Sequence, residues 1–91
     1  MGWSDEIALN GQTLIFVLKD EQGQPIDGAS VTAQIIRPVQ DGHDFTVTLI
    51  ETENHIYEAV PSFPMAGAWF VRIHATWQGK SYQSSKTMIV R

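Results

Sequence analysis

The sequence predicts an all-β domain in which two antiparallel sheets with six or seven strands in total pack face to face. Apolar and polar residues alternate over short stretches, which is the pattern of strands that bury one face. Turn-forming Gly, Pro, Asn and Asp residues separate these stretches at intervals of roughly 8–12 residues. Pro or Gly interrupts every window that is long enough for a helix. We therefore expect a single immunoglobulin-like β-sandwich that covers residues 1–91.

The chain is organised around its longest predicted strand, residues 68–77. The even positions of this strand are mixed in character, whereas the odd positions are all apolar: Trp69, Val71, Ile73, Ala75 and Trp77. A turn at 64–67 leads into the strand, and Gln78-Gly79-Lys80 turns the chain back into a last strand at 82–90. Because a chain of 91 residues needs an efficiently packed core, we expect both indoles to lie between the two sheets.

Two strands are predicted near the N-terminus. Residues 3–9 form a weak edge strand, and Asn10-Gly11 is a typical hairpin turn. Residues 12–19 carry apolar side chains on both faces, which indicates a central strand or one whose outer face is covered. The connection 20–29 contains Gly and Pro. We expect its single Ile, Ile26, to be buried at one end of the core.

The middle of the chain predicts three further strands. Residues 30–36 alternate in apolar character and end before Pro38, which cannot donate to a strand ladder. Asp41-Gly42 is a hairpin signal ahead of the next strand, residues 45–50. A polar turn then connects to residues 55–60, from which a Pro-bounded corner leads to the long strand.

Composition and motifs exclude several functions. The formal net charge is −4 and no run of basic residues occurs, so we expect no nucleic-acid partner. Without Cys there is neither a disulfide nor a thiolate metal site. The Ser residues lack a nucleophile motif and there is no glycine-rich phosphate loop, so we expect no enzymatic activity. The sequence contains neither a membrane-spanning apolar run nor a signal-peptide pattern, and its abrupt start at Met1-Gly2-Trp3 suggests that the natural protein extends upstream.

Histidine and methionine are the residues that offer metal ligands. The three imidazoles, His43, His55 and His74, lie more than four positions apart, so no local zinc motif exists. Met65 and Met88 offer thioethers that suit Cu(I), with a histidine as third ligand. Because no paired methionine spacing supports such a site, we favour surface histidines and core methionines.

Carboxylates and outward aromatics are the remaining candidates. Acidic pairs occur at Asp5-Glu6, Asp20-Glu21, Asp41/Asp44 and Glu51/Glu53, and we expect them to be solvated turn residues. Phe63 lies in the Pro-bounded corner, and Phe70 points away from Trp69; both are candidates for a partner surface. If Phe70, Ile15, Val17 and Ile36 share an outward face, they form an apolar patch for a partner; alternatively, the second sheet or an N-terminal segment covers them.

Several motifs in the chain resemble those of a known family. They are Asp20-x-x-Gly23-x-Pro25-Ile26-x-Gly28-Ala29-x-Val31, Arg37-Pro38, His55-x-Tyr57-x-Ala59-x-Pro61 and Gly67-Ala68-Trp69-x-Val71-x-Ile73. The first also occurs in many bacterial immunoglobulin-like modules. With the later Tyr57 and Gly67-Ala68-Trp69 elements included, residues 12–91 resemble the periplasmic domain of FixH proteins and, more distantly, YtkA-like domains.

The resemblance implies a bacterial inner-membrane protein with one N-terminal membrane helix, removed upstream of Trp3, and this β domain on the periplasmic side. It also implies a role beside a copper-transporting ATPase in the assembly of a cbb3-type cytochrome oxidase. We therefore expect a non-enzymatic accessory domain that contacts membrane proteins of an oxidase-assembly or cation-transport system. It would hold no resident cofactor, although copper is possible. Two alternatives stay open: a copper-binding YtkA-like domain that uses His43, His55 or His74 with Met65 or Met88, and an immunoglobulin-like spacer of a larger surface protein.

Overall fold

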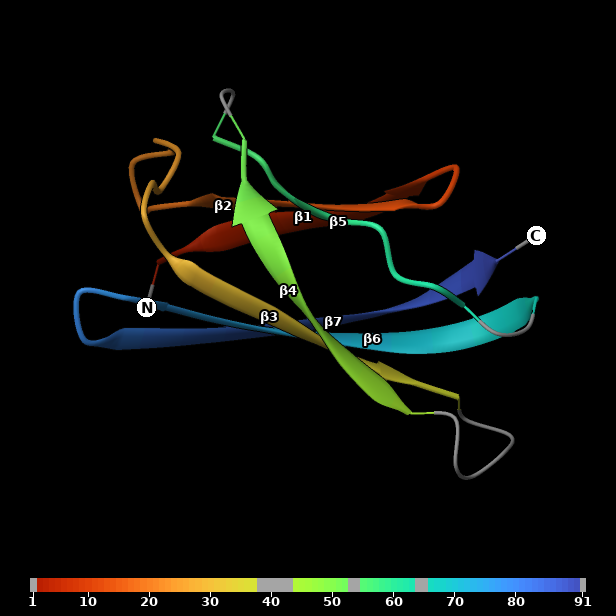
Figure 1. Cartoon of the computed structure of the whole chain (residues 1–91). Coiled ribbons are helices and arrows are strands. Elements are labelled where there is room, and N and C mark those ends of the chain that lie inside the picture. Colours follow the sequence, from red (N-terminus) through yellow and green to blue (C-terminus); the bar gives the residue numbers. More distant parts are fainter. Residues whose placement is uncertain (1, 38–43, 53–54, 64–65, 91) are drawn as a thin grey trace.

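The structure, a computed structural model, describes residues 2–37, 44–52, 55–63 and 66–90, and within these ranges it contains strands but no helix. The all-β prediction is therefore confirmed (Figure 1). No segment of the described ranges is a helix of the length and apolar character that a membrane span requires. The strands are β1 Ser4–Asn10, β2 Thr13–Lys19, β3 Ser30–Ile36, β4 Phe45–Glu51, β5 Tyr57–Ala59, β6 Gly67–Trp77 and β7 Lys80–Val90.

All strand pairs are antiparallel, in the order β1-β2-β5-β4-β3-β6-β7. β4 joins the two layers of the sandwich, because its first part pairs with β3 up to Leu49, whereas Ile50 and Glu51 pair with β5. In Figure 1, β4 accordingly crosses from the layer of β3, β6 and β7 to the layer of β1, β2 and β5. This crossing carries Glu51 to one end of the sandwich.

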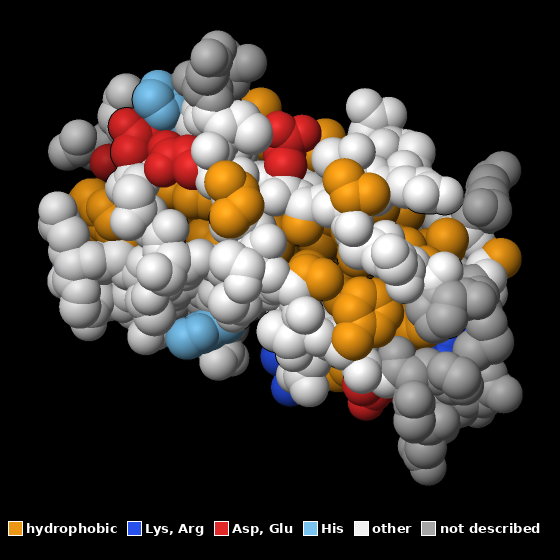
Figure 2. Space-filling view, in the orientation of Figure 1, with side chains coloured by type: hydrophobic (Ala, Val, Ile, Leu, Met, Phe, Trp, Pro, Cys, Tyr) orange, Lys and Arg blue, Asp and Glu red, His pale blue; other side chains and the backbone are white. Residues whose placement is uncertain are grey.

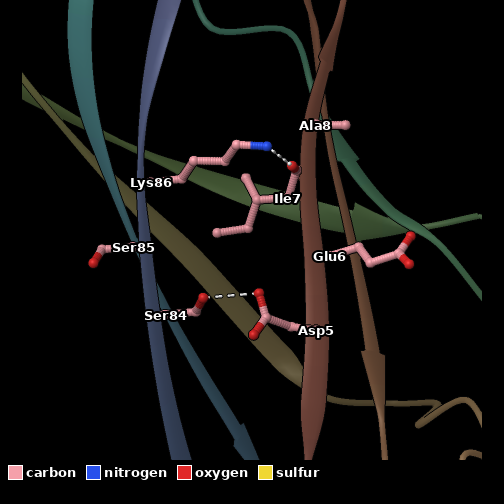
Figure 3. A pocket seen from close by; sticks show the side chains of 7 residues that line it. All are labelled: Asp5, Glu6, Ile7, Ala8, Ser84, Ser85 and Lys86. Atoms are coloured by element: carbon pink, nitrogen blue, oxygen red, sulfur yellow. Dashed lines mark hydrogen bonds between the residues drawn. The ribbon is translucent and has the colours of Figure 1, made fainter.

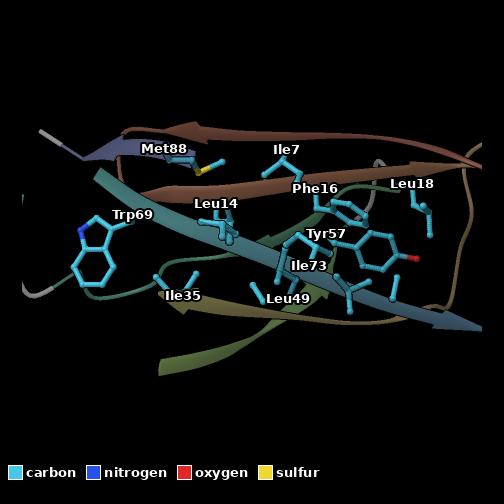
Figure 4. Packing of buried hydrophobic residues seen from close by; sticks show 14 of the residues in the cluster. Ile7, Leu14, Phe16, Leu18, Ile35, Leu49, Tyr57, Trp69, Ile73 and Met88 are labelled. Carbon is cyan, nitrogen blue, oxygen red and sulfur yellow. The ribbon is translucent and has the colours of Figure 1, made fainter. Parts of the chain in front are cut away.

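The core lies between the two layers and follows the predicted parity of the strands. Trp69 is fully buried at one end of the core, and Tyr57 and Leu18 lie toward the opposite end (Figure 4). Trp77 is half-buried and packs edge-on against Trp3, with 5.8 Å between ring centroids. The buried apolar residues are Ile7, Leu14, Phe16, Leu18, Ile26, Val31, Ala33, Ile35, Leu49, Tyr57, Trp69, Val71, Ile73, Ala75 and Met88. The predicted burial of Trp69 and Ile26 is thus confirmed, whereas Trp77, also expected between the sheets, is only partly buried against the core.

Turn chemistry shifts three predicted boundaries. The first hairpin loop is Gly11-Gln12, not Asn10-Gly11, since Asn10 pairs with Thr13. Gly11 has φ 62°, as a two-residue loop with Gly in its first position requires. The last hairpin turns at Gln78-Gly79, where both residues have positive φ (50° and 77°), so β7 begins at Lys80. The fifth strand is shorter than expected because the preceding turn extends to Ile56. The predicted Asp41-Gly42 turn lies outside the described residues.

The apolar patch that required four residues on one outward face is not formed. Ile15 and Val17 point outward from β2, since their neighbours Leu14, Phe16 and Leu18 are buried. Phe70 pairs with Ile36 on the outer face of the other layer, across β6 and β3. The alternation along each strand was read correctly, but the two pairs belong to different layers.

Candidate functional site

Three metal-ligating side chains from separate segments meet at one end of the sandwich. Nδ1 of His55 contacts Oδ1 of Asp27 and lies 3.7 Å from Oε2 of Glu51. The three donor atoms all lie within 4.8 Å of one another. In Figure 2, acidic side chains accordingly gather beside a histidine at the end of the molecule that β4 reaches. We call Asp27, Glu51 and His55 the carboxylate–histidine cluster.

The position of Asp27 is fixed by its neighbours in the β2–β3 connection. The Tyr57 hydroxyl donates to the Ile26 carbonyl (2.7 Å) and accepts from the Ala29 N–H (3.1 Å). The Gly28 N–H donates to Oε1 of Glu51 (2.8 Å). Residues 26, 28 and 29 are therefore all fastened, which holds the intervening Asp27 above the end of β4.

Tyr57 makes these contacts from inside the core. Burial raises the pKa of its hydroxyl above the usual value, and the negative charges of Glu51 and Asp27 raise it further, while the hydrogen bond from the Ala29 N–H lowers it. The hydroxyl therefore keeps its proton at neutral pH and can donate it to the Ile26 carbonyl. The carboxylates of the cluster thus lie close enough to this buried phenol to affect its titration.

The β4–β5 turn brings His55 back beside Glu51. The His55 N–H donates to the Thr52 carbonyl (3.2 Å), and the Thr52 N–H and hydroxyl both donate to the Ile56 carbonyl (2.7 and 3.1 Å). His55 has φ 60°, a left-handed conformation that tightens the turn. The cluster therefore presents one imidazole nitrogen and two carboxylate oxygens, which can form an ion pair or act as metal ligands.

The other predicted ligands do not join this cluster within the described residues. His74 is exposed on the outer face of β6, where it pairs with Thr32 and Gln83. Met88 is 5% exposed and points into the core opposite Trp69. His43 and Met65 lie outside the described residues.

Sequence reasoning singled out His55 but not its partners. Glu51 was interpreted as a solvated turn acid, and it is instead the last residue of β4, with a backbone N–H bound to its carboxylate. Asp27 gave no signal of its own. Two strands, β3 and β4, lie between Asp27 and His55 in the sequence, and only the fold brings the two residues together.

A second feature is a groove of about 470 Å³ between the edge strands β1 and β7 (Figure 3). Side chains bridge the two edges there: Tyr82 and Ser84 donate to the two oxygens of Asp5, the latter at 2.8 Å, and Lys86 donates to the Ile7 carbonyl at 3.1 Å. Asp5 was expected to be a solvated turn residue, but it lies within β1 and accepts two hydrogen bonds. The nearly closed sandwich is thus joined at this seam by side chains.

The seam predicts a loss of stability at high pH. Burial, the hydrogen bond to Asp5 and the Asp5 charge raise the pKa of Tyr82 from 10.0 to about 12. The folded state then binds the phenolic proton more tightly than the unfolded state, so this contribution is complete below pH 10 and is lost as the pH rises toward 12. Allowing for partial exposure, we expect about 1–2 kcal/mol. Urea unfolding at pH 9 to 12 should show a steeper decline for the wild type than for Tyr82→Phe; equal slopes would contradict the assignment.

The two aromatic residues predicted for a partner surface differ in their surroundings. Phe63 is half-buried and packs on Trp69 (5.6 Å between ring centroids) and Phe45 (6.3 Å). Phe70 is half-buried on an outer face, with the Arg72 guanidinium carbon 5.7 Å from its ring centroid. Their contact with a partner stays a prediction.

More strongly exposed apolar side chains lie elsewhere. Ile50 is 65% exposed and Val60 is 67% exposed. Glu58 of β5 pairs with Ile15 of β2 on one side and with Ile50 of β4 on the other. Ile50, Val60 and Ile15 thus surround the outer side of β5, and we call them the β5 patch. Ile89, 61% exposed, lies on β7 in the other layer.

Comparison with known proteins gives one family match. The FixH family model matches residues 1–88 of the chain. A search of curated proteins found no match.

Proposed function

Because the chain belongs to the FixH family, we propose that it is the extracytoplasmic accessory domain of a membrane protein that assists assembly of a cbb3-type cytochrome oxidase or the associated copper transport. The domain would lie on the periplasmic side of the inner membrane and act through protein contacts without catalysis. The observation that carries this proposal is the family match, which spans nearly the whole domain.

The β5 patch supports a role in protein contacts. Ile50 and Val60 each expose about two thirds of their surface to solvent. Burying such side chains against a partner contributes roughly 25 cal/mol for each Å² of apolar surface removed from water. The patch lies on the outer face of the layer that holds β5, so a partner can reach it without disturbing the core.

The proposal predicts an assembly defect in a bacterium that carries the gene. Deleting the gene should lower the amount of assembled cbb3-type oxidase at least several-fold, and the full-length wild-type gene should restore it. The double variant Ile50→Glu/Val60→Glu should restore much less, because two buried carboxylates would destabilise the contact. Oxidase activity in membranes and the haem-stained complex on native gels measure the result.

Ile89→Glu is the control, since it places a single carboxylate, one of the two that the double variant adds, at a similarly exposed apolar position in the other layer. It should restore assembly fully, with all variants present at wild-type level. An oxidase and copper-transport system unaffected by deletion would overturn the proposed function. Full restoration by the double variant would instead exclude the β5 patch as the contact surface.

A further inference from the structure

We propose that the carboxylate–histidine cluster is a binding site for a divalent cation of borderline softness, Zn²⁺ or Cu²⁺. The proposal goes beyond the accessory role and does not depend on it, because it follows from the positions of Asp27, Glu51 and His55 alone. A metal at this site would be held by Nδ1 of His55 and by one oxygen each from Asp27 and Glu51.

The spacing of the donor atoms suits a single ion. Zinc bonds to nitrogen and oxygen of about 2.0–2.2 Å place neighbouring ligands of a tetrahedron about 3.3–3.6 Å apart. Nδ1 of His55 is already in contact with Asp27 and is 3.7 Å from Oε2 of Glu51. Small side-chain rotations therefore bring all three donors to one centre. The three side chains come from the β2–β3 connection, the end of β4 and the β4–β5 turn, so an ion would tie these segments together.

The surrounding hydrogen bonds orient the ligands. Oε1 of Glu51 accepts the Gly28 N–H, which leaves Oε2 facing His55. The Tyr57 hydroxyl fastens the residues on both sides of the Asp27-Gly28 pair, through Ile26 and Ala29. Partners of this kind fix the direction of metal ligands and raise affinity. The cluster is therefore held in position before any ion binds.

The donor set selects the class of metal. One imidazole nitrogen and two carboxylate oxygens suit Zn²⁺ and Cu²⁺, whereas Cu(I) favours the sulfur ligands that this cluster lacks. Ca²⁺ takes six to eight oxygen ligands, and Mg²⁺ demands octahedral oxygen coordination. The side chains of Asp27 and His55 are at least half exposed, so a fourth coordination position stays open to solvent. Three ligands with an open position indicate an exchangeable ion rather than a closed structural centre.

Zinc titration of the tag-free chain tests the proposal. Calorimetry should show one Zn²⁺ per chain with a dissociation constant of roughly 1–100 µM, and Cu²⁺ should bind more tightly. Amide signals of residues 27–28, 51–52 and 55–57 should shift in ¹H–¹⁵N spectra. His55→Ala and Asp27→Asn should each weaken Zn²⁺ binding at least tenfold. Equimolar Ca²⁺ should leave these signals unchanged.

His74→Ala is the matched control, because it removes an exposed histidine that lies on the outer face of β6. It should leave Zn²⁺ affinity unchanged. Unaltered affinity in His55→Ala, with the dispersed spectrum of a folded chain, would overturn the proposal. Signal shifts centred on residue 74, or no binding at 1 mM Zn²⁺, would also overturn it. None of these results depends on oxidase assembly, so failure here and failure of the proposed function are separable.

Discussion

Replacing Trp69 with Ala is expected to lower the free energy of unfolding by about 3–5 kcal/mol, the usual cost of truncating a buried aromatic residue. The indole is fully buried, and the rings of Phe63 and Phe45 pack against it at centroid distances of 5.6 and 6.1 Å. The loss is a large part of the 5–15 kcal/mol typical of a small domain. Urea unfolding followed by far-ultraviolet circular dichroism measures it without depending on the removed fluorophore.

Trp77→Ala is the control for this prediction, because it removes the same side chain from the same face of β6. Trp77 is only half-buried and contacts Trp3 and the edge of the core. Its replacement should cost about 1–2 kcal/mol, since less apolar area returns to water. A cost for Trp77→Ala equal to that for Trp69→Ala would contradict the view that Trp69 anchors this end of the core.

The contacts of Trp69 also join two motifs that are distant in the sequence. The guanidinium carbon of Arg37 lies 5.1 Å from the centroid of the Trp69 ring, and Nη1 donates to the carbonyls of Ala66 (3.0 Å) and Ala68 (3.1 Å). Gly67 has φ 115°, and a Cβ there would lie 3.0 Å from the guanidinium. Arg37 and Gly67-Ala68-Trp69 are thus parts of one contact, in which Gly permits the close approach.

The strands could be predicted from the sequence because each has its own alternation. Residues 30–36 were placed correctly, since Val31, Ala33 and Ile35 are buried and their neighbours are not. The crossing of β4 between layers could not be predicted in this way. The alternation along β4 correctly puts Leu49 inward and Ile50 outward, but it carries no sign that the pairing partner changes from β3 to β5 after Leu49.

The candidate site was less predictable than the fold because its residues meet through long-range contacts. His55 could be singled out by residue type, but its two partners depend on where β4 ends and on how the β2–β3 connection folds back. Tyr57 holds that connection in place, and the alternation of residues 55–60 indicates only that Tyr57 shares a face with Ala59. Its hydroxyl contacts, not its hydrophobicity, determine where Asp27 lies.

Tyr57→Phe is therefore expected to lower the free energy of unfolding by about 2–3 kcal/mol, although it removes a single oxygen. The hydroxyl is the partner of both the Ile26 carbonyl and the Ala29 N–H, and the ring is fully buried. Phe leaves these two backbone groups without that partner where water has little access. Urea unfolding at pH 7 measures the change.

Tyr82→Phe is the matched control, since its hydroxyl also bonds a distant segment but at the half-buried seam between β1 and β7. Asp5 keeps its bond from Ser84 in that variant, so the cost at pH 7 should be about 1 kcal/mol or less. An equal or larger cost for Tyr82→Phe would contradict the importance assigned to the Tyr57 hydroxyl.

Tyr57→Phe also tests whether the fold positions the residues of the carboxylate–histidine cluster before an ion binds. Tyr57 is not a ligand, yet Tyr57→Phe releases the residues that hold Asp27 in place. Zn²⁺ affinity should therefore fall about tenfold, as is usual when a group that orients a metal ligand is lost. Amide exchange at Ala29 should accelerate in parallel, whereas Tyr82→Phe should change neither quantity. Faster exchange with unchanged Zn²⁺ affinity would contradict this prediction and show that Asp27 reaches the ion without support from the Tyr57 hydroxyl.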